Sequence, residues 1–127
     1  PIRYVYKIDN VLFSHGGVLK YFVEEHVQKE KYDDADMVVE DLNKLGVREM
    51  WNDASPIWLR PQYSKMKLYK ENELLQVVGH TPMDKITRKE NVISCDVFST
   101  YRDGRPIGTQ EFLLLDTESW EYCGIKG

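Results

Sequence analysis

Blocks of apolar and polar residues along the chain predict two short strands followed by a helix. The segments 3–8 and 11–14 are apolar runs joined by Asp9-Asn10, a pair of residues that suits a tight turn, so both runs are expected to be strands. Over residues 18–31 the apolar positions change to helical spacing and gather on one face. A helix is therefore expected to begin directly after the two glycines at 16–17, with its N-terminus facing that turn.

The middle of the chain predicts a second helix and then a loop. Asp33 or Asp34 can cap this helix at its N-terminus, and Gly46 is a suitable place for it to stop. Residues 51–61 are irregular and contain prolines, which is typical of a surface loop, whereas residues 64–73 could form a short helix.

The last third of the chain predicts strands alone. The segments 92–97, 107–115 and 120–125 have strand character and are separated by turn residues such as Asp103-Gly104. Together with the earlier elements, they predict an α/β protein with a mixed sheet, two or three helices and a strand-rich C-terminal part. The chain of 127 residues is expected to form a single domain, residues 1–127.

Two histidines follow apolar runs in similar ways. His15 lies in the run 12–18 before two glycines, and His80 lies in the run 76–82 after a glycine. A polar residue just beyond a buried strand lies at the edge of the sheet, where ligands bind in α/β proteins, so both histidines are expected to point toward one place. Neutral imidazole is a common ligand of divalent metals, and glycine allows backbone to approach a bound phosphate closely.

These runs carry a family resemblance. Ser14-His15-Gly16-Gly17 and Gly79-His80-Thr81-Pro82 resemble the last two of five motifs in the calcineurin-like metallophosphoesterases, especially the bacterial branch similar to serine/threonine and diadenosine tetraphosphate phosphatases. Residues 55–61 are similar to the Trp-x-Arg segment of that family. The resemblance implies the C-terminal half of a layered α/β/β/α sandwich.

The same resemblance implies roles for three residues. His15 and His80 would bind one metal ion, and Arg60 would contact the phosphate of the substrate; no residue here is implied as catalytic. The complete enzyme would hold two divalent ions, drawn from Mn, Fe, Zn and Ni, that activate a water for attack on phosphorus. Its substrate would be a phosphorylated protein or a nucleotide.

The first three motifs of that family are absent from the chain. Asp-x-His, Gly-Asp-x-x-Asp and Gly-Asn-His occur nowhere in the 127 residues. We therefore expect a C-terminal fragment of a metal-dependent phosphoesterase that has little metal affinity or activity alone. The alternative is a noncatalytic α/β binding or regulatory module on the same scaffold. A half-fold would also expose apolar surface, so two copies could associate as a homodimer.

Charge and composition narrow the classes of partner. A net charge of −4 argues against binding to nucleic acid polymers, which needs a basic face. Apolar runs are too short to cross a membrane and no signal peptide is evident, so a cytoplasmic location is expected. Cys95 and Cys123 lack the spacing of a zinc or redox site and are expected as reduced thiols, with a disulfide only if their strands are neighbours.

Each candidate residue also has a purely structural interpretation. His15 could form a hydrogen bond across a strand end, and Arg60 could be a surface cation. Asp96 is expected to close a turn, Trp58 to pack in the core, and His26 to pack on the apolar face of its helix.

Overall fold

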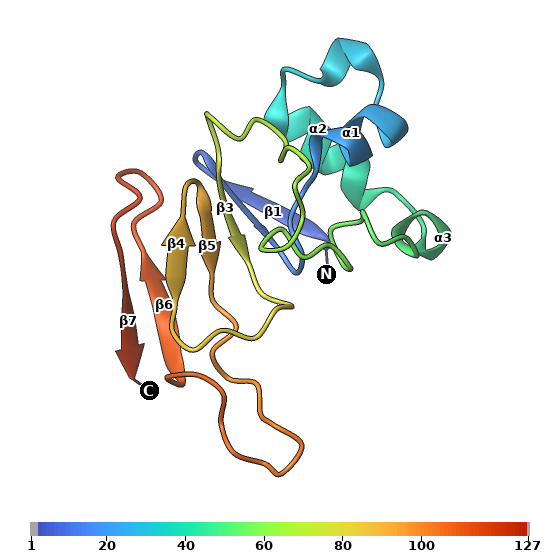
Figure 1. Ribbon diagram of the computed structural model, residues 1–127. Helices are drawn as coiled ribbons and strands as arrows, with labels where there is room; N and C mark the ends of the chain where they lie inside the picture. The colour runs from blue at the N-terminus through green and yellow to red at the C-terminus, as the bar shows by residue number, and fades with distance from the viewer. Residues whose placement is uncertain (1–2, 127) are drawn as a thin grey trace.

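The computed structural model describes residues 3–126 and shows a mixed α/β fold (Figure 1). The strands are β1 (Val5–Ile8), β2 (Val11–Ser14), β3 (Leu75–Val78), β4 (Thr87–Lys89), β5 (Val92–Ser94), β6 (Glu111–Leu115) and β7 (Tyr122–Lys126). The helices are α1 (Lys20–His26), the short 3-10 helix η1 (Lys29–Lys31), α2 (Ala35–Asn43) and α3 (Val47–Met50).

Five of the strands form one mixed sheet in the order β1-β2-β3-β5-β4. The central strands β2, β3 and β5 are parallel, whereas β1 and β4 run antiparallel to their neighbours at the two edges. The register pairs Ser14 with Val78, the last residues of β2 and β3. Their carboxyl ends therefore meet at one edge of the sheet, where the segments after both strands lie close together.

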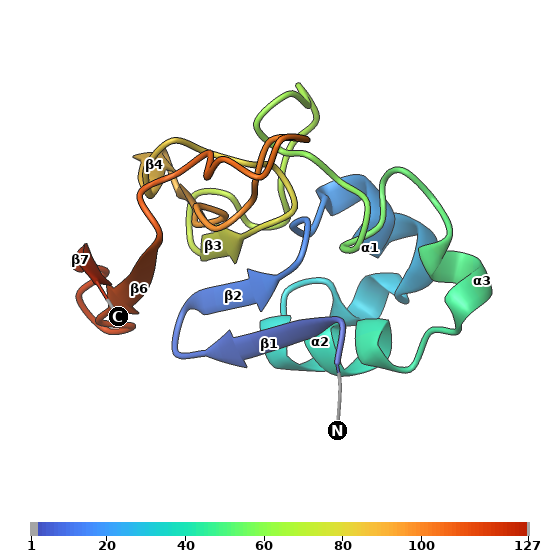
Figure 2. The ribbon, with the colours of Figure 1, turned by 90° about the horizontal axis from the view of Figure 1, so that it is seen from below.

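The helices cover one face of this sheet, and Figure 2 shows α1, α2 and α3 grouped on the side of β1 and β2. Leu12 of β2 and Phe22 of α1 are fully buried in the core between them. Burial of a side chain of this size contributes about 1.5–3 kcal/mol. The other buried members of this core are Val5, Val18, Leu19, Val23, Val27, Val38, Val39, Leu42, Met50, Leu59, Tyr69 and Leu74.

The opposite face packs against the two-stranded sheet of β6 and β7. Its core consists of Val11, Leu75, Val77 and Ile93, which alternate with the residues that face the helices. The apolar residues packed against it are Phe13, Ile86, Cys95, Leu113, Leu115 and Trp120. The alternation in β2 thus supplies both cores from one short strand, with Leu12 in the first and Val11 in the second.

The helix α2 begins and ends with side-chain hydrogen bonds. The carboxylate of Asp34 accepts from the backbone N–H of Met37 at 3.2 Å, as an N-cap residue should. At the other end, Asn43 Oδ1 accepts from the N–H groups of Tyr4 and Val5 at 2.9 and 3.0 Å, and Asn43 Nδ2 donates to the Val5 carbonyl at 2.8 Å. One amide side chain therefore ties the end of α2 to the edge strand β1.

The helix expected over residues 18–31 is shorter than its spacing indicates, and its start differs. Val18 and Leu19 stay extended, because the side chain of Gln76 binds both the N–H and the carbonyl of Val18. The helix begins only at Lys20, whose N–H donates to the Lys67 carbonyl at 3.0 Å. The helix therefore does not begin directly after the two glycines as expected, and its first N–H is not free.

The helix expected over residues 64–73 was also wrong. Tyr69 donates its backbone N–H to the Val18 carbonyl at 2.9 Å, and Lys70 takes a positive φ of 47°, so this segment lies extended beside the start of α1. Gly46 does follow α2, but it also caps α3, which the sequence did not predict.

Strands near the C-terminus are shorter than their apolar runs. The run 92–97 gives a strand only to Ser94, and the run 107–115 gives one only from Glu111. The polar segment Thr87–Lys89 forms the edge strand β4, which the pattern missed because a strand with no buried residue shows no apolar alternation. The mixed α/β class is confirmed, whereas the layered phosphoesterase sandwich is not.

Within residues 3–126, every helix is too short or too polar to span a membrane. Cys95 follows β5 and Cys123 lies in β7 of the separate sheet, and both are free thiols.

Candidate functional site

The structure brings His15 and His80 into direct contact. Nε2 of His15 lies 2.8 Å from Nδ1 of His80, and their ring centroids are 4.7 Å apart. Each histidine follows the carboxyl end of one of the parallel strands β2 and β3, which explains how two residues distant in sequence meet. The hydrogen bond needs one ring nitrogen to donate and the other to accept, so at least one of the two rings must be neutral.

The backbone of both site segments is held in place. Gly79 donates its N–H to the carbonyl of His15 at 2.9 Å, which ties the two segments together. His80 itself has a φ of 63°, in the left-handed region that residues with a Cβ seldom adopt. Strain of this kind costs about 1–3 kcal/mol and is concentrated in functional sites of proteins.

Glycine at position 16 allows a third segment to approach. The N–H of Gly16 donates to the Pro56 carbonyl at 2.5 Å, and a Cβ at this position would lie 2.6 Å from the Leu59 carbonyl oxygen. Only a residue without a side chain leaves room for the loop at 55–60. This contact places Arg60 beside the histidines.

The guanidinium of Arg60 is oriented by the His80 segment. Its Nη1 donates to the His80 carbonyl at 3.3 Å and to the hydroxyl of Thr81 at 3.2 Å. Arg60 is exposed, whereas Thr81 is 2% exposed and forms a fixed acceptor. A guanidinium has five N–H donors, so these contacts leave donors for an external anion.

The buried side chain of Gln76 holds the backbone of the segment that follows His15, a role that the sequence analysis missed. Its amide is 1% exposed, accepts from the Val18 N–H at 2.7 Å and donates to the Val18 carbonyl at 3.0 Å. The hydroxyl of Ser14 accepts from the Gly17 N–H at 2.8 Å within the same turn. A glutamine inside the apolar run of β3 was the available signal, because a buried amide needs partners.

The electrostatic surroundings favour an uncharged His80. Desolvation by burial lowers the pKa of His80, the charge of Arg60 and the proximity of His15 lower it further, and Asp96 partly opposes them. The lowered pKa favours the neutral form of His80 at neutral pH. A neutral imidazole keeps one lone pair that can accept a proton.

Asp96 and Cys95 lie beside this site but are engaged elsewhere. Both carboxylate oxygens of Asp96 accept from the Ser99 hydroxyl at 2.9 Å, as expected of a residue that closes a turn. Burial, and then the charge of Asp96, raises the pKa of the Cys95 thiol, which donates to the Val78 carbonyl at 3.3 Å. A cysteine nucleophile must form a thiolate, so this thiol is poorly suited to attack.

The structure places the remaining candidates differently. Trp58 is 41% exposed and lies edge-on to His80, with ring centroids 6.0 Å apart, so its expected place in the core was wrong. His26 packs against Phe22 at a centroid distance of 4.4 Å, on the apolar side of α1, as expected.

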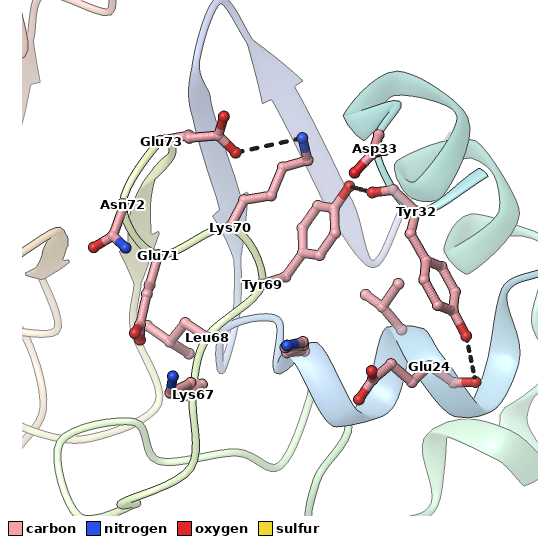
Figure 3. Close-up of a pocket in the computed structure, with 12 residues that line it drawn as sticks. Glu24, Tyr32, Asp33, Lys67, Leu68, Tyr69, Lys70, Glu71, Asn72 and Glu73 are labelled. Carbon is pink, nitrogen blue, oxygen red and sulfur yellow. Dashed lines mark hydrogen bonds and ion pairs between the residues drawn. The ribbon is translucent and has the colours of Figure 1, made fainter. Parts of the chain in front are cut away.

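A separate hollow of about 350 Å³ lies beside α1 (Figure 3). Side chains of both signs line it, among them Lys67, Lys70, Glu24 and Glu73, and Lys70 forms an ion pair with Glu73 at 3.4 Å. None of the three site residues predicted from the sequence lines this hollow. Its mixed charges indicate no particular ligand, so the histidine pair is the better candidate site.

Comparisons with known proteins identify the fold but no family. Neither the protein-family models nor the curated proteins give a match. Among solved structures, the chain is similar to a cold-active protein tyrosine phosphatase of a psychrophile, Shewanella sp., and to a mutant of a cold-active protein tyrosine phosphatase, each with 18% identity and a TM-score of 0.52. These matches cover 98% of this chain but only 43% of the other chains, so the chain spans less than half of their length.

These findings correct the resemblance to calcineurin-like metallophosphoesterases and the two metal ions that it implied. The solved structures with this fold are named as protein tyrosine phosphatases, and no metallophosphoesterase family model matches. In the described residues 3–126, His15 and His80 belong to no group of three or more His, Cys, Asp or Glu side chains that could hold a metal ion. Two short motifs were too little sequence to carry a family assignment. The individual roles of His15, Arg60 and His80 stay predictions.

Proposed function

We propose that His15, Arg60 and His80 bind the phosphoryl group of a phosphate ester, and that the chain forms part of a phosphatase. One observation carries this proposal: a hydrogen-bonded histidine pair, with nitrogens 2.8 Å apart, lies beside an exposed guanidinium that is bonded to the backbone of the second histidine. The three groups come from three segments and converge at the edge of the sheet where α/β proteins bind ligands.

The groups suit phosphate chemistry. A guanidinium can give two parallel hydrogen bonds to phosphate oxygens and offset the charge that develops on them during hydrolysis. The neutral His80 can accept a proton from an attacking water, and an imidazole of the pair can donate to the departing oxygen. Attack by water is favoured over attack by Cys95, because the raised pKa of that thiol keeps it protonated.

The similarity in fold to structures named as protein tyrosine phosphatases supports this class of reaction. We accordingly favour a phosphorylated protein over a nucleotide as the substrate of the complete protein. Because the chain spans less than half of those structures, further residues of a complete protein would contribute to the reaction.

The test is binding of inorganic phosphate, measured by calorimetry in a buffer with EDTA, together with hydrolysis of 4-nitrophenyl phosphate. We expect millimolar phosphate binding that falls at least tenfold in Arg60→Gln, since an ion-paired hydrogen bond is lost. Arg102→Gln removes another exposed arginine, in the loop between β5 and β6, and should change nothing.

The outcomes separate the candidate functions. Binding that depends on Arg60 together with hydrolysis supports a phosphatase. Binding without hydrolysis supports the alternative, a noncatalytic binding or regulatory module. Absence of binding, or equal loss in both arginine variants, contradicts the proposed phosphate site.

A further inference from the structure

Two tryptophans form an exposed aromatic surface beside the histidine pair. Trp51 is 74% exposed and Trp58 is 41% exposed, although large aromatic side chains usually bury most of their surface. With Asn52 and Asp53 they line an open hollow of about 510 Å³. Such an aromatic surface next to a polar site is typical of ligand recognition.

The rings continue directly from the candidate site. The centroid of Trp58 lies 6.0 Å from that of His80 at an interplanar angle of 86°, and the centroid of Trp51 lies 5.4 Å from that of Trp58 at 84°. Aromatic groups attract one another in this edge-to-face arrangement. Because each contact uses only part of a ring, the exposed surfaces of both indoles stay available to a further planar group.

The backbone that carries this aromatic surface is hydrogen-bonded at both tryptophans. Trp58 donates its N–H to the carbonyl of the fully buried Ser55 at 3.1 Å, and Trp51 donates its N–H to the Val47 carbonyl at 3.0 Å, at the end of α3. Trp58 is also only two residues from Arg60 in the same loop. A ligand held by Arg60 would therefore meet aromatic side chains whose backbone is already ordered, which reduces the entropy lost on binding.

We infer that Trp51 and Trp58 form a subsite for a planar aromatic group carried by the phosphate ester that binds at Arg60 and the histidines. This inference rests on the proposed function and adds the chemical class of the substrate. The carboxylate of Asp53 in the same hollow disfavours a second anionic group there, so the subsite selects against a negatively charged ring.

The test compares phosphonates and phosphates that differ only in the aromatic group. Calorimetry would measure binding of methylphosphonate against phenylphosphonate, and of ribose 5-phosphate against adenosine 5′-monophosphate. We expect an aromatic member of at least one pair to bind about tenfold more tightly, the size of one aromatic contact. Tighter binding of phenylphosphonate would indicate an aryl ester, whereas tighter binding of adenosine 5′-monophosphate would indicate a nucleoside.

Substitutions of the two tryptophans test whether the higher affinity for the aromatic ligand depends on this subsite. Trp58→Leu should weaken binding of the aromatic ligand more than binding of its non-aromatic counterpart and so abolish the preference, whereas Trp58→Phe should keep most of it. If Trp58→Leu fails to fold, as judged by circular dichroism, Trp51→Leu serves instead, because its side chain is 74% exposed. Equal affinity within both ligand pairs, or a preference that survives Trp58→Leu and Trp51→Leu alike, would overturn the subsite and leave the proposed function standing. Failure of all four ligands to bind would overturn the proposed function, and the subsite with it.

Discussion

At the scale of single residues, the site depends on groups that restrain one another. His80 has a positive φ of 63°, its carbonyl accepts a hydrogen bond from Arg60, and its ring is hydrogen-bonded to the ring of His15. His80 thus positions both the guanidinium of Arg60 and the imidazole of His15. Protonation of His80 should therefore also change the positions of Arg60 and His15.

The pH dependence of His80 gives the first prediction. Its pKa in the folded protein lies below the ordinary value of about 6.5 expected in the unfolded chain, mainly because of desolvation. The unfolded state therefore binds the proton more readily, so the stability due to neutral His80 is present above about pH 6.5 and is lost as the pH falls through the folded pKa. NMR titration of the ring should give a pKa below that of a histidine in a short peptide, and His15→Gln should raise it. A His80 pKa at or above the peptide value would contradict this picture.

The geometry of Arg60 gives the second prediction. Lysine would keep the charge but could not bond the His80 carbonyl, the Thr81 hydroxyl and a phosphate through one planar group. We expect Arg60→Lys to weaken phosphate binding about three- to tenfold, less than Arg60→Gln does. Calorimetry with inorganic phosphate measures both. Equal affinity of Arg60→Lys and the parent protein would show that only the charge matters.

At the scale of elements, the sequence was most informative where a local run of apolar residues was enough to determine a strand. The apolar runs of β2 and β3, each followed by a histidine and glycine, correctly predicted strands whose ends meet. The segment 64–73 was misjudged because its conformation depends on a hydrogen bond to Val18, a partner about fifty residues away. Trp58 was misjudged for a similar reason, since its exposure depends on how the 55–60 loop packs on Gly16.

The contact at Gly16 gives a prediction at this scale. A Cβ there would lie 2.6 Å from the Leu59 carbonyl oxygen, and backbone on both sides cannot move aside cheaply. We expect Gly16→Ala to destabilise the fold by about 1–3 kcal/mol and to weaken phosphate binding, because the loop carrying Arg60 must shift. Gly79→Ala is the matched control for stability, since the nearest atom to a Cβ there is the His15 carbonyl oxygen at 3.9 Å, an ordinary contact. Urea unfolding measures the difference, and equal stability of the two variants would contradict the tight packing.

At the scale of the whole molecule, the two faces of the structure are unequally covered. Helices cover one face of the main sheet, and the hairpin of β6 and β7 covers part of the other (Figures 1 and 2). The outer face of that hairpin is itself uncovered: Phe112, Leu114 and Ile125 are 54%, 56% and 46% exposed. Phe98 extends this apolar face, with its ring centroid 4.9 Å from that of Phe112.

This apolar face leads us to expect weak self-association, in keeping with the homodimer proposed from the sequence. Exposed apolar surface of this kind is stabilised by contact with a second copy. Sedimentation velocity should show a mass that rises with protein concentration, and Leu114→Lys should reduce it. Met37→Lys, at an exposed position of α2, is the control that should not. A monomer at every concentration would rule this association out.

The link between Tyr32, at the end of η1, and the segment before β3 gives the last prediction. The hydroxyl of Tyr69 donates to the Tyr32 carbonyl at 2.5 Å, beside Asp33 (Figure 3). Burial, followed by the charges of Asp33, Asp34 and Glu73, raises the pKa of Tyr69 to about 12 from the ordinary value of 10.0. The unfolded chain therefore releases this proton first, so the stability that the hydroxyl provides is complete below about pH 10 and is lost as the pH rises toward 12.

Tyr69→Phe should consequently cost about 0.5–1.5 kcal/mol at pH 8, because the Tyr32 carbonyl loses its donor, and the cost should shrink steadily between pH 10 and 12. Urea unfolding at a series of pH values measures this difference directly. Tyr101→Phe, at a tyrosine that is 51% exposed, is the matched control and should show no such trend. A constant difference between the Tyr69 variant and the parent protein across this range would mean that the hydroxyl ionises at its ordinary pKa in the folded protein, and would contradict the effect of burial and of the neighbouring carboxylates.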